Sequence, residues 1–269
     1  MTTVKNLMNL AGRRALITGA AGGIGRQMAL TIAELGGHLI LVDLPGADFS
    51  TLSALLKDVI HENAEIAYIN CNLEDGGQRR KLVSDVLDMK TGLDILINNA
   101  AFVATSGLDG WTCDFTGQSI DTWRRALEVN ITAAFELSQG LVSLLRASGK
   151  GSIINVASIY GVNGPDYSLY AGTDMGNPAA YSVSKGGLIQ LTRWLATTLA
   201  PSVRVNTISP GGVYRNQPQK FVDRYIARTP LRRMAVEEDF KGVTAYLASD
   251  LSIYTTGQNL LVDGGWSIW

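Results

Sequence analysis

Tyr181 and Lys185, in the run Tyr181-Ser182-Val183-Ser184-Lys185, have the types and spacing of a general acid and base. Residues four positions apart lie on one face of a helix. A free tyrosine has a pKa near ~10, and a lysine ammonium about 4 Å away favours the phenolate by on the order of 4 kcal/mol at an effective dielectric of about 20. We therefore expect Lys185 to lower the pKa of Tyr181, so that the phenol exchanges protons near neutral pH. The alternative is a solvated helix pair.

The glycine-rich run Thr18-Gly19-Ala20-Ala21-Gly22-Gly23-Ile24-Gly25 follows an apolar stretch and precedes a segment with helical periodicity. Glycines permit a tight turn there and let backbone N–H groups approach a pyrophosphate, and the helix N-terminus favours the anion. The run predicts a dinucleotide-binding turn. An ordinary turn between a strand and a helix is the alternative.

Asp43 lies 24 residues after Gly19, near the ~20-residue spacing of the ribose-binding acid in dinucleotide folds. A carboxylate there accepts hydrogen bonds from a ribose 2′-hydroxyl and repels a 2′-phosphate. Leu44 follows it, and the turn before Gly25 holds no Arg or Lys to neutralise a phosphate. These residues favour NAD over NADP, unless Asp43 only caps the turn before Pro45-Gly46.

Short apolar runs alternate with longer helical segments and would position these groups. The strands read as continuous Ile, Leu and Val runs, which is typical of parallel strands covered on both faces. The alternation predicts a single-domain Rossmann-type α/β fold over 1–269, doubly wound, with a seven-stranded parallel sheet flanked by helices. Strands are expected at 15–18, 38–42, 65–70, 93–97, 152–156, 203–208 and 259–262, and helices at 24–35, 51–62, 78–89, 119–147, 179–199, 221–227 and 237–248, with loops at 102–117 and 160–178.

Composition excludes several classes of protein. The formal net charge is −1 and the sequence pI is about 6.1, which argues against nucleic acid or an anionic membrane as a partner. Two cysteines are too few for a disulfide framework, and neither has metal-ligand spacing, so we expect no metal and a reducing, cytoplasmic location. We expect no membrane span and no secretory signal.

Two features predict an assembly of several copies. Charged residues make up 17% of the chain, against a usual ~25%. The chain also ends in Gly264-Gly265-Trp266-Ser267-Ile268-Trp269, and such apolar side chains are typical interface anchors. We expect a homotetramer, or at least a homodimer.

The residues described so far resemble the short-chain dehydrogenase/reductases, in their compact single-domain branch, over nearly the whole chain. The resemblance rests on motifs that occur in the family's order. They are the turn Thr18–Gly25, Asn98-Asn99-Ala100, Asn130, Ser158, Tyr181 with Lys185, Pro210-Gly211, and Gly257-Gln258 followed by Val262-Asp263-Gly264-Gly265.

The resemblance implies a role for each group. Tyr181 would give or take the hydroxyl proton, Ser158 would hydrogen-bond the substrate oxygen, and Lys185 would also hold the ribose. Asn130 would keep a water in place for a proton relay, while Asn98 and Ala100 would line the adenosine-ribose side. Pairing of the two longest helices would form a four-helix interface between subunits. The cofactor-binding residues would be Gly19, Gly23, Ile24, Gly25, Asp43, Asn72, Leu73, Asn99, Ala100, Tyr181, Lys185, Pro210, Gly211 and Val213.

The chain departs from the family pattern at several points. Asn72 stands where the family has an Asp that meets the adenine, and Ala101 replaces a glycine. The threonine that grips the carboxamide is not evident after Pro210-Gly211, so a backbone group would replace it. Ser158 and Tyr181 are 23 positions apart, longer than the family norm, which indicates an insertion at about 160–178 beside the active site.

We therefore expect an NAD(H)-dependent oxidoreductase that interconverts a secondary alcohol and a ketone, with a polar substrate such as a sugar or polyol derivative. A weaker resemblance connects the insertion to sugar-modifying oxidoreductases of flagellin and surface-glycan pathways. The alternatives are an NAD-retaining epimerase or dehydratase, and a catalytically silent dinucleotide-sensing protein on the same fold. The polar side chains that suggest the substrate, unless they simply face solvent, are Asp166, Tyr167, Ser168, Tyr170, Thr173, Asp174 and Asn177 in the insertion, and Arg215, Asn216, Gln217 and Gln219 after Pro210.

Overall fold

A computed structural model describes residues 2–103 and 105–269 of the chain, and one sheet organises them. The sheet has seven strands in the order β3-β2-β1-β4-β5-β6-β7, and every neighbouring pair is parallel. The predicted doubly wound α/β fold is thus confirmed. The strands are β1 (Arg14–Thr18), β2 (His38–Asp43), β3 (Ile66–Asn70), β4 (Ile95–Asn98), β5 (Gly151–Val156), β6 (Val203–Pro210) and β7 (Asn259–Val262).

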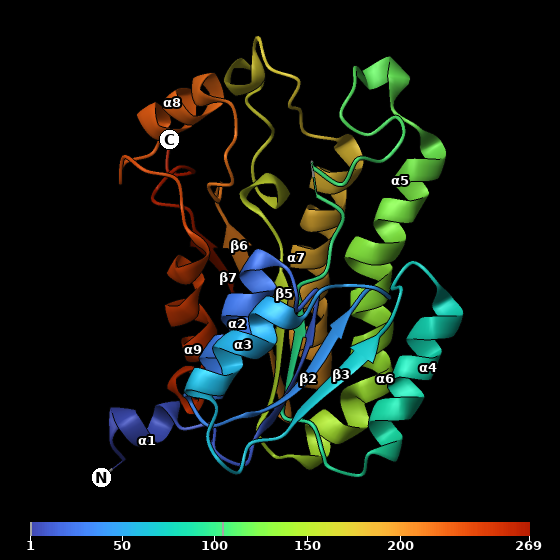
Figure 1. Cartoon of the computed structure of the whole chain (residues 1–269), viewed down its shortest axis with the longest axis vertical. Helices are drawn as coiled ribbons and strands as arrows, with labels where there is room; N and C mark the ends of the chain where they lie inside the picture. The colour runs from blue at the N-terminus through green and yellow to red at the C-terminus, as the bar shows by residue number, and fades with distance from the viewer. Residues whose placement is uncertain (1, 104) are drawn as a thin grey trace.

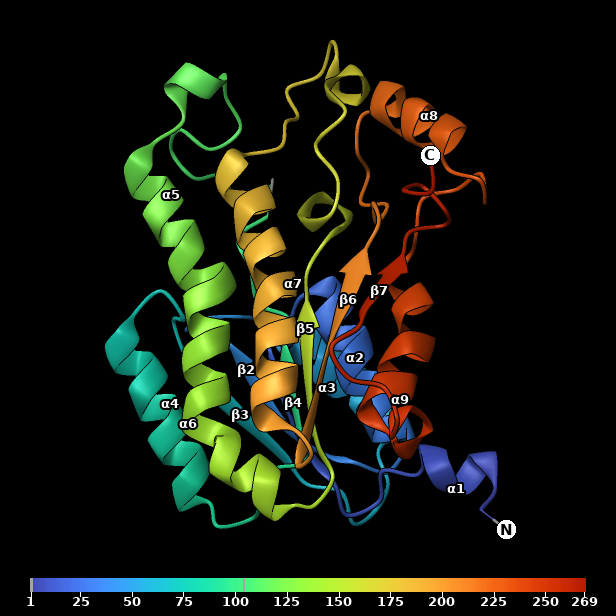
Figure 2. The same cartoon turned by 180° about the vertical axis from the view of Figure 1, so that it is seen from behind.

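Helices cover both faces of the sheet. Figure 1 shows α2, α3 and α9 in front of the sheet, and Figure 2 shows α4, α5, α6 and α7 on the opposite face. The short α1 lies near the end of the molecule where the strands begin, and α8 lies beyond the carboxyl ends of β6 and β7 (Figure 2). The helices are α1 (Val4–Met8), α2 (Gly23–Glu34), α3 (Ser50–Val59), α4 (Gly76–Asp88), α5 (Ile120–Leu127), α6 (Ala133–Ala147), α7 (Ala179–Leu199), α8 (Gln219–Arg228) and α9 (Lys241–Ala248).

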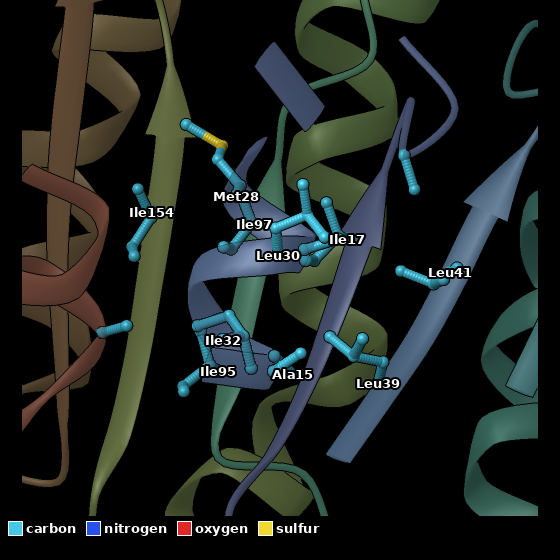
Figure 3. Close-up of a cluster of buried hydrophobic side chains, with 14 of the residues drawn as sticks. Ala15, Ile17, Met28, Leu30, Ile32, Leu39, Leu41, Ile95, Ile97 and Ile154 are labelled. Atoms are coloured by element: carbon cyan, nitrogen blue, oxygen red, sulfur yellow. The ribbon is translucent and has the colours of Figure 1, made fainter. Parts of the chain in front are cut away.

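The core has two layers because the central strands β1, β4 and β5 are buried on both faces, whereas the edge strands β3 and β7 are only partly covered. Ala15 and Ile17 of β1 pack toward α2, where Met28 and Ile32 meet them (Figure 3). Leu16, between them, packs into the second layer under α4, α6 and α7. Alternate residues point to opposite faces of a strand, so a strand buried on both sides must be apolar throughout.

The long helix predicted over 119–147 is interrupted. α5 ends at Leu127, a π-helical turn spans Glu128–Thr132, and α6 begins at Ala133. In this turn the N–H of Ala133 donates to the carbonyl of Glu128, five residues earlier. The predicted helix 237–248 likewise starts as a 3₁₀ turn, and α1 was not predicted, because five residues carry too little periodicity to detect.

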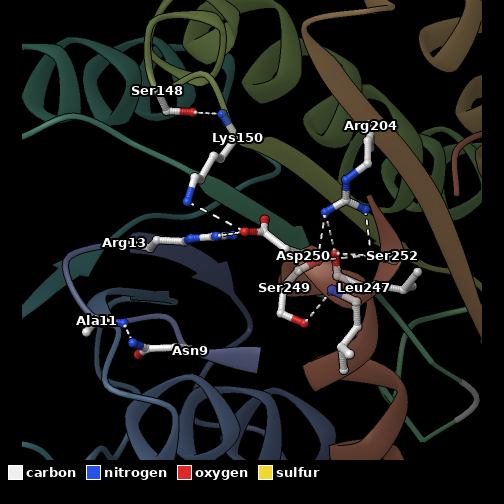
Figure 4. Close-up of polar contacts among 11 residues, drawn as sticks. Asn9, Ala11, Arg13, Ser148, Lys150, Arg204, Leu247, Ser249, Asp250 and Ser252 are labelled. Carbon is white, nitrogen blue, oxygen red and sulfur yellow. Dashed lines mark hydrogen bonds and ion pairs between the residues drawn. The ribbon is translucent and has the colours of Figure 1, made fainter. Parts of the chain in front are cut away.

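An ionic cluster closes the amino end of the sheet (Figure 4). Arg13 donates to Asp250 at 2.6 Å, and the Lys150 ammonium lies 3.5 Å from the same carboxylate. Arg204 donates to the Ser252 hydroxyl at 2.7 Å and to the Leu247 carbonyl. These contacts hold α9 and the segment after it against the starts of β1, β5 and β6. A ligand-binding site would therefore lie at the other end, where the strands have their carboxyl ends.

The order of the strands indicates where that site lies. β1 is followed in space by β2 and β3 on one side, and the chain then crosses to β4 on the other side. A crevice opens beyond the carboxyl ends of the strands at such a reversal, and ligands bind there in open α/β sheets.

No described helix is both long and apolar enough to cross a bilayer.

Candidate active site

A cavity of about 840 Å³ opens at the carboxyl ends of the strands, at the reversal between β1 and β4. Most of the residues predicted from the sequence line this one space, although they come from seven separate segments. Asn130 and Asn98 are the exceptions. The predicted residues that line it are Gly19, Gly23, Ile24, Gly25, Asp43, Asn72, Leu73, Asn99, Ala100, Ser158, Tyr181, Lys185, Pro210, Gly211 and Val213.

The turn between β1 and α2 is a cradle that admits no side chains at its key positions. Gly19 has φ of +64°, in the left-handed region that favours glycine. A Cβ on Gly25 would lie 2.1 Å from the Gly19 carbonyl oxygen. The first turn of α2 has N–H groups without intrahelical partners, and these face the cavity with the positive end of the helix dipole. The turn therefore fits the pyrophosphate of a dinucleotide.

Asn99 holds the cradle from below. Its side-chain amide donates to the carbonyls of Thr18 at 2.9 Å and Gly19 at 3.0 Å. The Thr18 hydroxyl accepts in turn from the backbone N–H groups of Asn99 and Ala100. The prediction that Asn98 lines the ribose side is wrong, since its side chain points into the sheet and donates to Asn155 at 2.8 Å.

Asp43 ends β2 at the rim of the cavity. One carboxylate oxygen accepts from the Ala21 N–H at 2.9 Å and the other from the Leu44 N–H at 2.8 Å. Asp43 therefore caps its turn, as the alternative proposed, and also ties β2 to the cradle while lining the cavity. Asp48 lines the same end, and no motif or spacing in the sequence pointed to it. Its own hydrogen bonds with Ser50 lower the pKa of the Asp48 carboxyl.

Asn72 and Leu73 line the cavity after β3. The Asn72 side-chain oxygen accepts from the Glu74 N–H at 3.1 Å. That bond is an Asx-type turn, so it fixes the loop and leaves the amide nitrogen as the side chain's polar group toward the cavity.

α7 carries Tyr181 and Lys185, but their electrostatics differ from the prediction. Lys185 is 3% exposed, and its ammonium donates to the Val156 carbonyl at 2.7 Å and lies 5.8 Å from the centre of the Tyr181 ring. Burial lowers the pKa of Lys185 to about 7. Burial also raises the pKa of Tyr181, although a hydrogen bond with Ser158 and the charge of Arg215 oppose the rise. The prediction that Lys185 lowers the pKa of Tyr181 is thus wrong, because the groups that oppose the rise are Ser158 and Arg215, and desolvation outweighs them.

Ser158 follows β5 and lies beside Tyr181. Its hydroxyl oxygen accepts from the Tyr160 N–H at 3.1 Å. That bond fixes the hydroxyl at the entrance of a short 3₁₀ turn and leaves its proton free to be donated to a substrate oxygen or to Tyr181.

Asn130 lies in the π-helical turn, 1% exposed, outside the main cavity. Its amide accepts from the Phe102 N–H at 2.7 Å, and donates to the Phe102 carbonyl at 3.2 Å and the Ser184 hydroxyl at 3.0 Å. The side chain therefore clamps the loop after β4 to α7, between Tyr181 and Lys185. Its predicted part in a proton relay stays a prediction.

The segment after Pro210 brings a cation to the cavity. The Arg215 guanidinium donates to Glu237 at 3.0 Å, and both side chains lie against the cradle, since a Cβ on Gly23 would be 2.6 Å from the Glu237 carboxylate. Arg215 thus lies between the predicted phosphate site and Tyr181. From the sequence it was only one of several polar residues in a loop.

The insertion at 160–178 contributes one wall of the cavity, while Tyr167, Ser168 and Asp174 face solvent, as the alternative proposed. Arg228 of α8 forms an ion pair with Asp166, and Arg224 donates to the carbonyls of Leu169 and Ala171. Leu169 is fully buried among side chains of α8. The insertion residues that line the cavity are Tyr160, Tyr170, Met175, Gly176 and Asn177.

The carboxyl-terminal tail differs from its prediction as an interface anchor. Trp266 is 1% exposed inside its own chain, stacked on Tyr225 with ring centres 5.9 Å apart, and the Arg228 guanidinium lies 4.5 Å over its ring. Only Ile268 and Trp269 remain exposed there. Ile268 and Trp269 are as hydrophobic as Trp266, so the sequence could not indicate which of the three side chains is buried within the chain.

Together these features define a class of protein. A phosphate cradle at the start of α2, a carboxylate at the end of β2 and a serine, tyrosine and lysine beyond β5 and on α7 form the site of a dinucleotide-dependent oxidoreductase. Within residues 2–103 and 105–269, no group of three or more His, Cys, Asp or Glu side chains is placed to hold a metal ion.

Comparisons with known proteins agree with this class. The family model described as Enoyl-(Acyl carrier protein) reductase matches residues 19–267. The 3-oxoacyl-[acyl-carrier-protein] reductase of Thermotoga maritima is 31% identical over 265 residues, covering 96% of this chain and 99% of its own. The NADP-dependent mannitol dehydrogenase of Alternaria alternata is 29% identical over 276 residues, covering 99% and 97%.

Among solved structures, a short-chain dehydrogenase from Leptospira borgpetersenii with bound NAD⁺ superposes with a TM-score of 0.81 at 31% identity, covering 99% of this chain and 96% of its own. This chain belongs to the short-chain dehydrogenase/reductase family, whose members are oxidoreductases that bind a nicotinamide dinucleotide.

Proposed function

We propose that this protein is an NAD(H)-dependent oxidoreductase that interconverts a secondary alcohol and a ketone on a polar, hydroxylated small molecule. The observation that carries the proposal is the meeting of Ser158, Tyr181 and Lys185 in one cavity with the dinucleotide cradle. A protein that only senses the dinucleotide needs the cradle, but it does not need Ser158, Tyr181 and Lys185 placed together for proton transfer. Epimerases of the wider superfamily resemble its extended members, which have a larger carboxyl-terminal substrate region, whereas this chain resembles the compact single-domain branch.

The chain's own residues would divide the work. The turn Gly19–Gly25 would bind the pyrophosphate, and Asp43 would accept the adenosine ribose hydroxyls. Ser158 would donate to the substrate oxygen while the Tyr181 hydroxyl gives or takes the proton. When bound, the nicotinamide supplies the hydride chemistry. Lys185 would place a positive charge between Tyr181 and the ribose when it is protonated.

The preference for NAD is supported by charge. Asp43 and Asp48 both line the end of the cavity where a 2′-phosphate would lie, and the residue between them in the cavity wall is the apolar Leu44. The basic side chains that line the cavity, Lys185 and Arg215, are at the catalytic and pyrophosphate positions instead. The relatives bind either cofactor, so this preference rests on these residues.

The polar substrate is supported by the insertion and by one relative. Tyr160, Tyr170 and Asn177 bring hydroxyl and amide groups to the substrate end of the cavity. The Alternaria alternata relative is named for mannitol, a polyol, whereas the Thermotoga maritima relative is named for an acyl-carrier-protein substrate.

The proposed homotetramer is supported by exposed apolar side chains on the two long helices. Phe135 on α6 and Val183 and Trp194 on α7 face outward, and Figure 2 shows the two helices side by side on one outer face of the molecule. Such a face is suited to a second copy of the chain.

We also propose a cytoplasmic enzyme, because the two cysteines are unpaired.

The test is a panel of polyols, sugars and simple alcohols with NAD⁺, and of the matching ketones with NADH, followed by the absorbance of NADH. Net formation or consumption of NADH supports the proposal. Conversion of a substrate without net change of NADH would indicate an epimerase or dehydratase. NADH binding without conversion of any compound would indicate a sensor.

A further inference from the structure

Two tyrosines of the insertion meet on the cavity wall. The hydroxyl oxygens of Tyr160 and Tyr170 are 2.6 Å apart, and both residues line the cavity. Burial, together with the neighbouring tyrosines, raises the pKa of Tyr160, and burial raises the pKa of Tyr170 to about 12. Both phenols therefore keep their protons at any physiological pH.

The Tyr160 and Tyr170 hydroxyls carry two protons but share only one hydrogen bond. Each hydroxyl carries one proton, and a single hydrogen bond between the two oxygens uses only one of them. In the described ranges 2–103 and 105–269, neither hydroxyl makes another hydrogen bond. The second proton is therefore available to an acceptor in the cavity, and a bound group that excludes solvent without accepting it leaves that donor unpaired.

Asn177 adds a second group without a partner. It is 6% exposed and lines the cavity, and its amide nitrogen donates to the Ser182 hydroxyl at 3.1 Å. Its carboxamide oxygen is buried with no hydrogen-bond partner among the described residues. If the amide were turned over, the nitrogen would lack a partner instead. In either orientation one polar atom of this cavity-lining side chain lacks a partner among the described residues.

The rings that carry the hydroxyls are fixed by aromatic packing. Tyr160 meets the edge of Trp266 with ring centres 6.1 Å apart, and Tyr170 packs on Phe221 at 5.4 Å. The tail and α8 thus hold the donor in place before any ligand arrives. A preorganised donor loses little entropy on binding, so it discriminates well between ligands.

We propose that Tyr160, Tyr170 and Asn177 form a subsite that binds a further hydroxyl group of the substrate, beside the carbon that Tyr181 and Ser158 serve. The substrate class is then a polyhydroxylated alcohol or its hydroxy ketone. Hydroxyl groups both donate and accept hydrogen bonds, so a substrate with several of them can pair with the free phenol proton and with the amide. An acyl chain or other apolar substrate would leave both unpaired. The inference rests on the proposed alcohol and ketone chemistry and names its substrate.

The test compares matched ketones with NADH: dihydroxyacetone against acetone, erythrulose against butanone, and xylulose against a pentanone. For at least one pair we expect kcat/KM for the hydroxylated ketone to exceed that of the simple ketone by about a hundredfold or more. Sites built to hydrogen-bond a substrate hydroxyl reject the analogue without it by larger factors, on the order of ten thousandfold.

Variants assign that preference to the subsite. The double variant Tyr160→Phe with Tyr170→Phe keeps the aromatic packing and removes the donors, and Asn177→Leu removes the amide. Each should lower kcat/KM for the hydroxylated ketone by about tenfold or more, chiefly through KM, and leave the simple ketone unchanged. Tyr167→Phe is the matched control, because Tyr167 lies in the same insertion, is 62% exposed and is not part of the cavity wall.

Two results would overturn the inference while the proposed function stands. One is a wild-type enzyme that reduces both kinds of ketone equally well. The other is a pair of variants that lose activity equally on both kinds, which would mean that the side chains only maintain the fold. Failure to reduce any ketone of the panel, with NADH bound, would instead reject the proposed function itself.

Discussion

We propose that the choice between NAD and NADP depends on Asp43, which lines the cavity beside Asp48. A 2′-phosphate carries nearly two negative charges and would enter the end of the cavity that Asp43 and Asp48 line. Each pair of unit charges about 4 Å apart contributes on the order of 1–4 kcal/mol, between bulk water and a protein surface. We expect kcat/KM for NAD to exceed that for NADP at least about a hundredfold, which corresponds to about 2.7 kcal/mol.

Asp43→Asn removes the charge at nearly constant shape. The Asp43 carboxylate also accepts from the Ala21 N–H at 2.9 Å, so its loss should weaken binding of both cofactors through the cradle. The ratio of the two kcat/KM values isolates the electrostatic part, and we expect it to fall about tenfold, since Asp48 remains. Asp43→Ser with Leu44→Arg should narrow the ratio further or reverse it, because Leu44 is 51% exposed and an arginine there can pair with the phosphate.

Steady-state kinetics with both cofactors, at fixed ionic strength, measure these ratios. Asp58→Asn is the matched control, since it removes the same charge from the exposed face of α3, away from the cavity wall. Its ratio should equal that of the wild type. Equal efficiency with NAD and NADP in the wild type would refute the reasoning and leave Asp43 with its turn-capping role alone.

Four further results are expected. Tyr181→Phe should reduce kcat to less than a few per cent while NADH still binds, as measured by fluorescence titration; substantial residual turnover would contradict its role in proton transfer. Because the pKa of Tyr181 is raised, alcohol oxidation, which needs the phenolate, should speed up as the pH rises above neutral, whereas ketone reduction, which needs the protonated phenol, should hold its rate until the pH approaches that raised pKa; an oxidation rate that does not change with pH would contradict this. Gly25→Ala should abolish NADH binding, because its Cβ would lie 2.1 Å from the Gly19 carbonyl, whereas Gly242→Ala, with open space around it, should bind normally. Light scattering at micromolar concentration should give a tetramer, and Trp194→Glu should dissociate it; a monomeric wild type would contradict the proposed assembly.

Much of the site could be predicted because it depends on local sequence. The glycines of the cradle, Asp43 at the end of a strand and the four-residue step from Tyr181 to Lys185 are each recognisable within a short segment. Parallel strands then bring the segment ends to one edge of the sheet without any further information. For the same reason Asp48 was missed, since an exposed loop carboxylate has no distinctive spacing.

Other features depended on contacts between distant segments. Asn98 and Asn99 are neighbours of the same type, and only the sheet decides that one points to Asn155 and the other to the cradle. The π-helical turn at Glu128–Thr132 likewise places Asn130 against Phe102, which no periodicity indicates.

The sequence by itself determined the class of fold, the position of the glycine-rich turn and the four-residue step from Tyr181 to Lys185 on which the proposed proton transfer rests, because period and spacing encode them locally. Tertiary structure decided the environment of those groups. Burial raises the pKa of Tyr181 and lowers that of Lys185, and packing on Trp266 places Tyr160 opposite Tyr170. Desolvation and hydrogen-bond pairing depend on which distant side chains surround a group, and those neighbours exist only once the chain has folded.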